Sequence, residues 1–160
     1  MIRLSLILAL AVTLGGCDLI VNDCLYDDVG CDLPGDWRLV SVNDEAMTGR
    51  WEIAEGFVDR SGYGVLPTGN EQFPEMRGAF ESDYSLDPDR PQGFDVQLWS
   101  MVVDNGTVYL DLYGRIESLD DDRMVYVVSR PDAELIFAGG GSIPLSFPLL
   151  ARGTRLIFER

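Results

Sequence analysis

The chain has 160 residues, 12 basic side chains against 27 acidic ones, and a formal net charge of −15. This charge argues against nucleic-acid binding, which needs a basic surface, and against attachment to anionic lipid by charge alone. Every basic residue is arginine and there is no histidine, which excludes Ser-His-Asp and Cys-His catalysis, His-ligated zinc, a lysine Schiff base and a lysine-containing phosphate loop.

Residues 1–16 have the pattern of a secretory signal. Met1-Ile2-Arg3 provides a positive start, and an apolar run follows from Leu4 to Leu14, interrupted only by a serine and a threonine. The run is too short to span a bilayer as a stable helix. Two small glycines then precede Cys17, as a signal peptidase requires beside its cut.

The stretch Leu14-Gly15-Gly16-Cys17 resembles the bacterial lipobox. The resemblance implies that the thiol of Cys17 carries a diacylglyceryl group, that the chain is cut before this cysteine, and that the new amino terminus is acylated. We therefore expect a lipoprotein of the bacterial cell envelope, held on a membrane by its lipid and facing the periplasm. Asp18 resembles the signal that keeps a lipoprotein at the inner membrane in enteric-type bacteria, so the prediction leans to that membrane and leaves the outer one open.

Residues 17–32 are predicted to be a lipidated acidic tether, and residues 33–160 a single β-domain. With Cys17 lipidated, Cys24 and Cys31 remain as a pair, and a disulfide is expected in an oxidising compartment. On a chain-entropy estimate, so short a loop contributes about 2.5 kcal/mol. The alternative is a metal site formed with the aspartates at 27, 28 and 32, but we expect no metal and no cofactor.

From residue 33 onward, apolar residues recur with a period of two, which is typical of strands. The first expected strands are Trp37–Val42, Trp51–Val58 with Gly56 as a bulge, Gly62–Leu66 and Arg77–Asp83. Prolines and an Asp-Pro-Asp-Arg turn punctuate this half of the chain, so the strands are expected to be short and separate.

The strongest local signal is a hairpin of Phe94–Val103 and Thr107–Glu117. The Asn105-Gly106 pair between them predicts a type I′ turn. Alternation predicts one buried face on each arm. In the first arm this face holds Phe94, Val96 and Leu98, and in the second it holds Val108, Leu110, Leu112 and Ile116.

An aspartate turn at 120–122 leads to a third strand, Arg123–Arg130, which completes a meander. The apolar segment Ala133–Leu150 is broken by three glycines and two prolines, so we expect a loop or the lip of a mouth. Thr154–Arg160 is the last expected strand. The sequence thus predicts an all-β fold, a single antiparallel meander sheet or barrel.

Two short stretches resemble lipocalin-like proteins. The Gly35-Asp36-Trp37 triplet resembles their Gly-x-Trp opening strand, and the ending "GTRLIFER" resembles the closing strand of bacterial lipocalin-like lipoproteins. The resemblance implies a late arginine packed over Trp37, with Arg160 the best match and Arg155 the second. Because the second lipocalin motif is not recognisable, a looser barrel or another all-β sheet fits equally well.

Two functions follow, neither of them enzymatic. The first is a lipocalin-like module that binds a small apolar or amphipathic ligand, lined by Trp51, Trp99, Phe137 and Phe147, with 133–150 as its lip. The alternative is a filled β-scaffold that docks an envelope protein through an edge strand or the 133–150 surface. A hydrolase with two carboxylates is a third class, but no motif selects a pair. A hollow interior favours ligand binding, and a filled one favours a scaffold.

Overall fold

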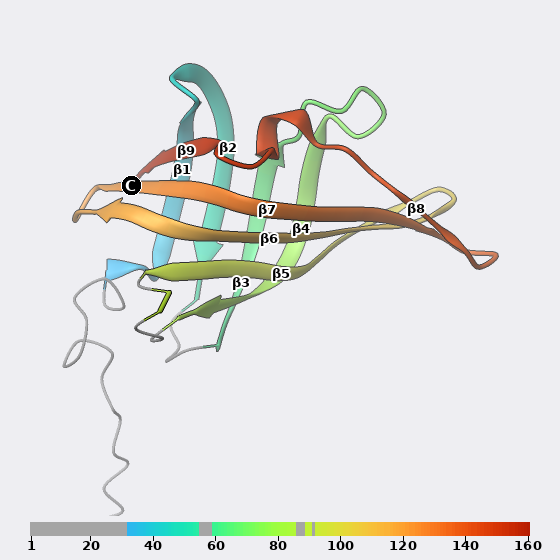
Figure 1. Cartoon of the computed structure of the whole chain (residues 1–160), viewed down its shortest axis with the longest axis horizontal. Helices are drawn as coiled ribbons and strands as arrows, with labels where there is room; N and C mark the ends of the chain where they lie inside the picture. The colour runs from blue at the N-terminus through green and yellow to red at the C-terminus, as the bar shows by residue number, and fades with distance from the viewer. Residues whose placement is uncertain (1–31, 55–58, 86–88, 91) are drawn as a thin grey trace, which may run out of the picture.

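The computed structural model describes residues 32–54, 59–85, 89–90 and 92–160 (Figure 1). The predicted signal segment, the lipidation site Cys17 and the Cys24–Cys31 pair lie outside these residues. Within the described part of the chain, no helix is long and apolar enough to cross a membrane.

Nearly all of the regular structure is strand. In chain order the elements are β1 (Gly35–Val42), β2 (Glu45–Ile53), β3 (Asp59–Pro67), β4 (Glu75–Tyr84), β5 (Gly93–Val103), β6 (Gly106–Leu119), β7 (Arg123–Phe137), β8 (Ser142–Pro144), the 3₁₀ turn η2 (Pro148–Leu150) and β9 (Arg155–Glu159). The predicted first, third, fourth and last strands are confirmed. The second is wrong at its start, because β2 covers Glu45–Ile53, and the predicted bulge at Gly56 lies outside the described residues.

The strands close into an antiparallel barrel. Each strand from β1 to β7 pairs with the next one in the chain, and β9 pairs with both β7 and β1. Eight strands, β1 to β7 and β9, therefore form the closed circle, while β8 pairs only with the far end of β7. The predicted all-β fold is confirmed, and its architecture is that of a lipocalin-like barrel (Figure 1).

Aromatic rings fill the middle of the barrel. Trp51 is fully buried and lies 4.6 Å from Phe158, 5.2 Å from Tyr126, 6.1 Å from Phe94 and 6.3 Å from Phe80, measured between ring centroids. Rings at these separations are in packing contact. Side chains therefore occupy the barrel interior around Trp51.

Glycines on β3 leave room for these rings. A Cβ on Gly62 would lie 2.4 Å from the Phe80 ring, and a Cβ on Gly64 would lie 2.7 Å from the Trp99 ring. Such distances are far below van der Waals contact, so no larger residue fits without displacing a ring. The glycines that make the sequence of β3 a weak strand signal are therefore required by the packing of the rings inside the barrel.

The predicted type I′ turn is wrong in place. Val103 pairs with Gly106, so the turn residues are Asp104 and Asn105, and neither has a positive φ. The turn with two positive φ angles joins β1 to β2, at Asn43 (49°) and Asp44 (68°), residue types that tolerate the left-handed region. Gly106 serves a different purpose, since a Cβ there would lie 2.0 Å from the carbonyl oxygen of Ile136.

A β-bulge in β5 changes which residues face inward. The pairing with β6 shifts between Val96 and Trp99, and Leu98 has a φ of 51° and is 58% exposed. Its backbone N–H donates to Asp111 Oδ1 at 2.8 Å, which satisfies the group that the bulge removes from the ladder. The prediction that Leu98 shares the buried face of Phe94 is therefore wrong, and Trp99 takes the inward position.

The meander continues further than predicted. The turn at 120–122 is confirmed, but β7 runs past Arg130 to Phe137, and β8 and η2 follow, so 133–150 is not an irregular loop. On this edge of β7, residues 123–127 pair with β9 and residues 134–136 pair with β8. Pro131 lies between these two stretches, so its missing N–H interrupts neither pairing. A proline is tolerated in a stretch between two pairings.

Candidate functional sites

The end of the barrel where β1 begins and β9 ends is sealed, and we call it the closed end. The Arg160 guanidinium carbon lies 4.2 Å from the centre of the Trp37 ring, the contact that the lipocalin-like resemblance implies. Arg160 also donates to the carbonyl oxygens of Asp32, Pro34 and Asp121, the last two at 3.0 Å. Gly35, with a φ of 137°, lies against this guanidinium.

Arg155, the second arginine that matched the resemblance, has another partner. It donates to Glu117 Oε2 at 2.6 Å on the outer surface. Side-chain parity explains the difference, because Arg160 follows the buried Leu156 and Phe158 on the inward face of β9. The closed end is therefore a structural seal, and the chain before Asp32 joins the barrel there.

The four residues predicted to line a ligand site do not share one site. Trp51 and Trp99 are fully buried in the ring-filled core, and Phe147 is buried beneath the opposite end of the barrel. Phe137 alone among the four lines a described pocket, where it is 36% exposed. Their types suggested a common lining, but inward-facing aromatic residues on strands usually pack against one another.

The pocket at Phe137 lies at the end of the barrel opposite Arg160, and we call it the mouth pocket. It has a volume of about 560 Å³. Its apolar lining is Phe73, Met101, Val103, Leu135 and Phe137, and its polar rim includes Gln72, Glu75, Asp104 and Asn105. The arrangement suits an apolar group that enters from solvent.

Residues 145–150 cover the rest of this end. Leu149 N–H donates to the Thr68 carbonyl oxygen at 3.0 Å, and Asn70 Nδ2 donates to the Ser146 carbonyl oxygen at 3.0 Å. Phe147 and Leu150 are buried beneath. Phe147 and Leu150 thus help to close the barrel, whereas residues 136–144 of the same segment are exposed.

The ends of β5, β6, β7 and β8 project beyond the other strands (Figure 1), and we call residues 100–109 and 134–144 the tip. Pairing aligns Val102, Thr107, Ile136 and Ser142 on one face, and Met101, Val108, Leu135 and Ile143 on the other. Because Val108 and Leu135 are buried, the second face continues the barrel interior. The tip carries five of the large apolar residues that are exposed, namely Val102 (84%), Ile143 (44%), Ile136 (38%), Phe137 (36%) and Tyr109 (36%).

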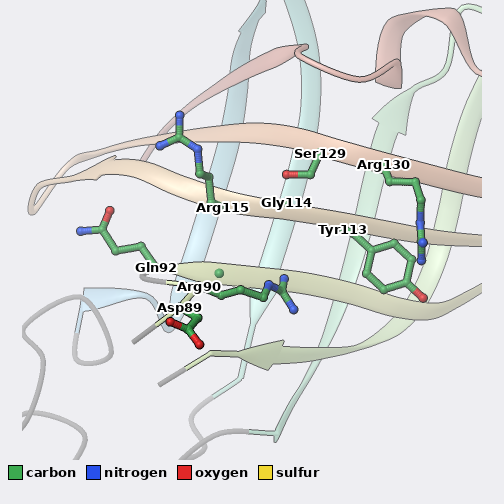
Figure 2. A pocket seen from close by; sticks show the side chains of 9 residues that line it. Asp89, Arg90, Gln92, Tyr113, Gly114, Arg115, Ser129 and Arg130 are labelled. Atoms are coloured by element: carbon green, nitrogen blue, oxygen red, sulfur yellow. The ribbon is translucent and has the colours of Figure 1, made fainter. Parts of the chain in front are cut away.

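A second pocket, the arginine groove, lies on the flank of the barrel across β5, β6 and β7. Its volume is about 660 Å³. Figure 2 shows Arg115 on one side, the Tyr113–Arg130 pair on the other, and Arg90 between them. Further lining residues are Asp89, Gln92, Gly93, Gly114 and Ser129.

A buried carboxylate, Asp95, holds the Arg90 guanidinium in place in this groove. Asp95 accepts from Arg90 Nη2 at 2.9 and 3.0 Å and from the Gly114 N–H at 3.2 Å. Beneath it, the Tyr126 hydroxyl lies 3.0 Å from the carbonyl oxygens of Phe94 and Leu112. Burial, and then the Asp95 charge, raise the pKa of Tyr126 well above its ordinary value, so this hydroxyl stays neutral.

Sequence reasoning missed the arginine groove. Arg90, Arg115 and Arg130 lie 25 and 15 residues apart, at no motif spacing, and each follows a different local pattern. The register of β5, β6 and β7 brings them together, with Gly93 opposite Arg115 and Tyr113 opposite Arg130. The one available signal was weak: three arginines near a tyrosine in a strongly acidic chain.

Comparisons with protein-family models, with curated proteins and with solved structures found no match for this chain.

Proposed function

We propose that this protein is a filled, non-enzymatic β-barrel scaffold that docks a partner protein through its tip. The observation that carries this proposal is that apolar side chains emerge on both faces of the tip. Val102 and Ile136 lie on the outer face, while Phe137 and Ile143 lie on the face that continues the interior. A small ligand in the mouth pocket covers one face only, whereas a protein can cover both.

The packing of the barrel supports a scaffold over an internal binding site. The aromatic cluster around Trp51 occupies the level where an enclosed ligand would lie. Ejecting one of these rings would leave a large cavity and cost several kcal/mol, about 3–5 for a tryptophan. A rigid core of this kind presents the tip in one fixed geometry, which lowers the entropy lost on docking.

The edge of the tip offers a mode of docking. β8 pairs with β7 on one side through Leu135 and its neighbours, and it stands outside the closed circle of strands. An extended segment of a partner can add to such an edge by main-chain hydrogen bonds, with its side chains in apolar contacts alongside. The acidic rim residues Glu75 and Asp104 favour a partner segment with basic residues beside its apolar ones.

The proposed setting is the bacterial cell envelope, with Cys17 carrying the lipid and a disulfide joining Cys24 and Cys31. The lipobox resemblance supports this setting. The described chain begins at Asp32 beside Arg160, at the end opposite the tip. An anchor on that side directs the tip away from the membrane.

Metabolic labelling with palmitate should mark the protein and should fail for Cys17→Ser. A full-length chain that retains its leader without label would contradict the anchor.

The docking proposal is tested by crosslinking in the native cells. A photoreactive residue at position 102, on the outer face, and at position 137, on the inner face, should each give the same protein adduct. Tyr63, 40% exposed on the flank of the barrel, is the control position and should not give it. Ile136→Glu should abolish both adducts, because a carboxylate would be buried at the interface.

An adduct that forms equally from position 63, or that survives Ile136→Glu, would contradict docking through the tip.

A small amphipathic ligand in the mouth pocket is the second candidate function, favoured by the pocket's volume of about 560 Å³. Native mass spectrometry separates the two candidates. A bound small molecule that is lost on Phe137→Ser and retained on Val102→Ser would favour the ligand site.

A further inference from the structure

The arginine groove on the flank of the barrel gathers three arginines in a chain that carries a net charge of −15. Arg90, Arg115 and Arg130 line it together with Asp89. Each of the three arginines also has a carboxylate beside it outside this lining, namely Asp95, Glu117 and Asp132. Elsewhere in the chain, acidic side chains outnumber arginines by more than two to one. We propose that this groove binds a small oxyanion, the phosphate or carboxylate group of a soluble molecule, independently of the docking at the tip.

Two of the three guanidinium groups are held in place before any ligand arrives. Arg90 is fixed by Asp95, a carboxylate that is itself only 7% exposed. The Arg130 guanidinium lies 4.1 Å from the centre of the Tyr113 ring, and its Nε forms an ion pair with Asp132 Oδ2 at 3.1 Å. A guanidinium that is already oriented loses less entropy when it binds an anion.

These internal contacts leave donors for a ligand. A guanidinium carries five N–H donors. Among the described residues, Asp95 engages only the Nη2 nitrogen of Arg90, and Asp132 engages only the Nε nitrogen of Arg130. The remaining N–H groups can form the charge-assisted, paired hydrogen bonds that phosphate and carboxylate groups accept.

Arg115 is the least engaged of the three. Its Nη2 lies 3.6 Å from Glu117 Oε1, while the other oxygen of Glu117 accepts from Arg155 at 2.6 Å. The Arg115 side chain is 52% exposed and stands across the groove from Tyr113 (Figure 2). It can therefore turn toward an anion without breaking a strong ion pair.

The floor of the groove is made of small residues. Gly114 and Ser129 lie between Arg115 and Arg130 (Figure 2), Gly93 also lines the groove, and the Ser129 hydroxyl adds a neutral donor. A Cβ on Gly93 would lie 3.3 Å from Arg90 Nη2 and 3.0 Å from the Ser85 Cβ. A larger residue at this position would therefore press on the central guanidinium, so Gly93 keeps Arg90 in its position.

The charge of the whole chain restricts the source of the oxyanion. A net charge of −15 repels an extended anionic surface such as a bilayer of acidic phospholipid, and this repulsion acts at long range. A small anion that enters the groove can instead accept hydrogen bonds directly from the guanidinium N–H groups that the internal contacts leave available. The geometry therefore favours a free small molecule over a lipid headgroup in a membrane.

Calorimetric titration of the full-length chain in non-ionic detergent, with inorganic phosphate at constant ionic strength, tests the proposal. Saturable binding is expected for the wild type. The double variant Arg115→Gln, Arg130→Gln should weaken it about a hundredfold, since each lost charge-assisted hydrogen bond contributes a factor of about ten. Arg38→Gln is the matched control, because Arg38 lies 3.6 Å from Glu159, is 69% exposed and lies outside the groove.

A second measurement uses the wild type alone and does not depend on the folding of a variant. In an NMR titration with inorganic phosphate, the amide signals of Gly93, Gly114 and Ser129 should shift with one common dissociation constant. Absence of saturable binding, an equal loss for Arg38→Gln, or shifts confined to other residues would overturn the proposal. Binding to phosphatidylglycerol vesicles that requires Arg115, without binding of free phosphate, would overturn the small-molecule source.

Discussion

The long strands β5, β6 and β7 run from the barrel into the tip, and their side chains are buried in the barrel but partly exposed at the tip. Along β6 the inward residues Leu110, Leu112 and Ile116 are fully buried, because they belong to the same core as the aromatic rings. At the tip, Phe137 and Ile143 lie on the face that continues this interior, and they are 36% and 44% exposed. An inward apolar strand residue is therefore fully buried only where the sheet closes around it, and the same alternation leaves apolar side chains exposed at the tip.

The largest expected effect comes from emptying the filled region. Trp51→Ala removes the ring that contacts Phe158, Tyr126 and Phe94, and should lower the free energy of unfolding by about 3–5 kcal/mol. Urea denaturation followed by circular dichroism measures this loss. Tyr63→Ala, at an exposed aromatic residue, should change stability by no more than about 0.5 kcal/mol. Equal effects at the two positions would show that the rings do not form a tight core.

Overfilling the same region should also destabilise it. Gly64→Ala places a Cβ 2.7 Å from the Trp99 ring and 2.9 Å from Trp51 Cδ1. We expect a loss of about 1–3 kcal/mol in the free energy of unfolding. Gly139→Ala is the control, because nothing lies within 4 Å of its Cβ, and it should leave stability almost unchanged. A neutral Gly64→Ala would mean that the barrel has unused room.

Alkaline pH probes the buried hydroxyl beside the arginine groove. The pKa of Tyr126 is raised well above its ordinary value of 10.0, mainly by burial, so the unfolded chain releases this proton at a lower pH than the folded one. The stability is therefore complete below about pH 10 and falls as the pH rises, by about 1.4 kcal/mol per pH unit for one group. Unfolding measured between pH 9 and 11 should show this slope, and Tyr126→Phe should flatten it. An unchanged slope in the variant would assign the loss to another group.

The seal at the closed end should contribute less than the core. Arg160→Gln removes the contact with Trp37 and the hydrogen bonds to the carbonyl oxygens of Pro34 and Asp121. We expect a loss of about 1–2 kcal/mol in thermal or urea denaturation. Arg155→Gln, which removes only an exposed ion pair with Glu117, should cost at most about 0.5 kcal/mol. A larger loss of stability for Arg155→Gln than for Arg160→Gln would contradict the assignment of Arg160 as the residue that seals the closed end.

The tip should show the smallest effect on stability. Val102→Ser alters a side chain that is 84% exposed, and should change the free energy of unfolding by less than about 0.5 kcal/mol. The same variant should reduce the crosslinked adduct formed from position 137 on the opposite face. A large loss of stability would show that Val102 is part of a core. An adduct of unchanged yield would contradict the proposal that one partner covers both faces of the tip.

The sequence carried the local features of this fold. Alternation in 107–117 predicted the buried face of β6, the aspartates at 120–122 predicted the turn into β7, and the Gly35–Trp37 and Arg160 positions predicted the contact at the closed end. Each of these depends on neighbours within one strand or hairpin, or on a resemblance that includes its own long-range contact. The predicted turn at Asn105-Gly106 failed because a glycine in a turn motif can instead be required for close approach of another strand.

Tertiary structure decided whether the barrel is hollow, which strand residues face inward after the bulge at Leu98, and which arginines meet in one groove. These properties depend on contacts between residues far apart in the chain. The closure of β9 against β1 and β7 brings Phe158 onto Trp51, and the register of β5, β6 and β7 brings Arg90, Arg115 and Arg130 together. A period of two specifies alternate faces of a strand, but the opposite wall of a closed sheet determines whether one of those faces is filled, lined or left exposed.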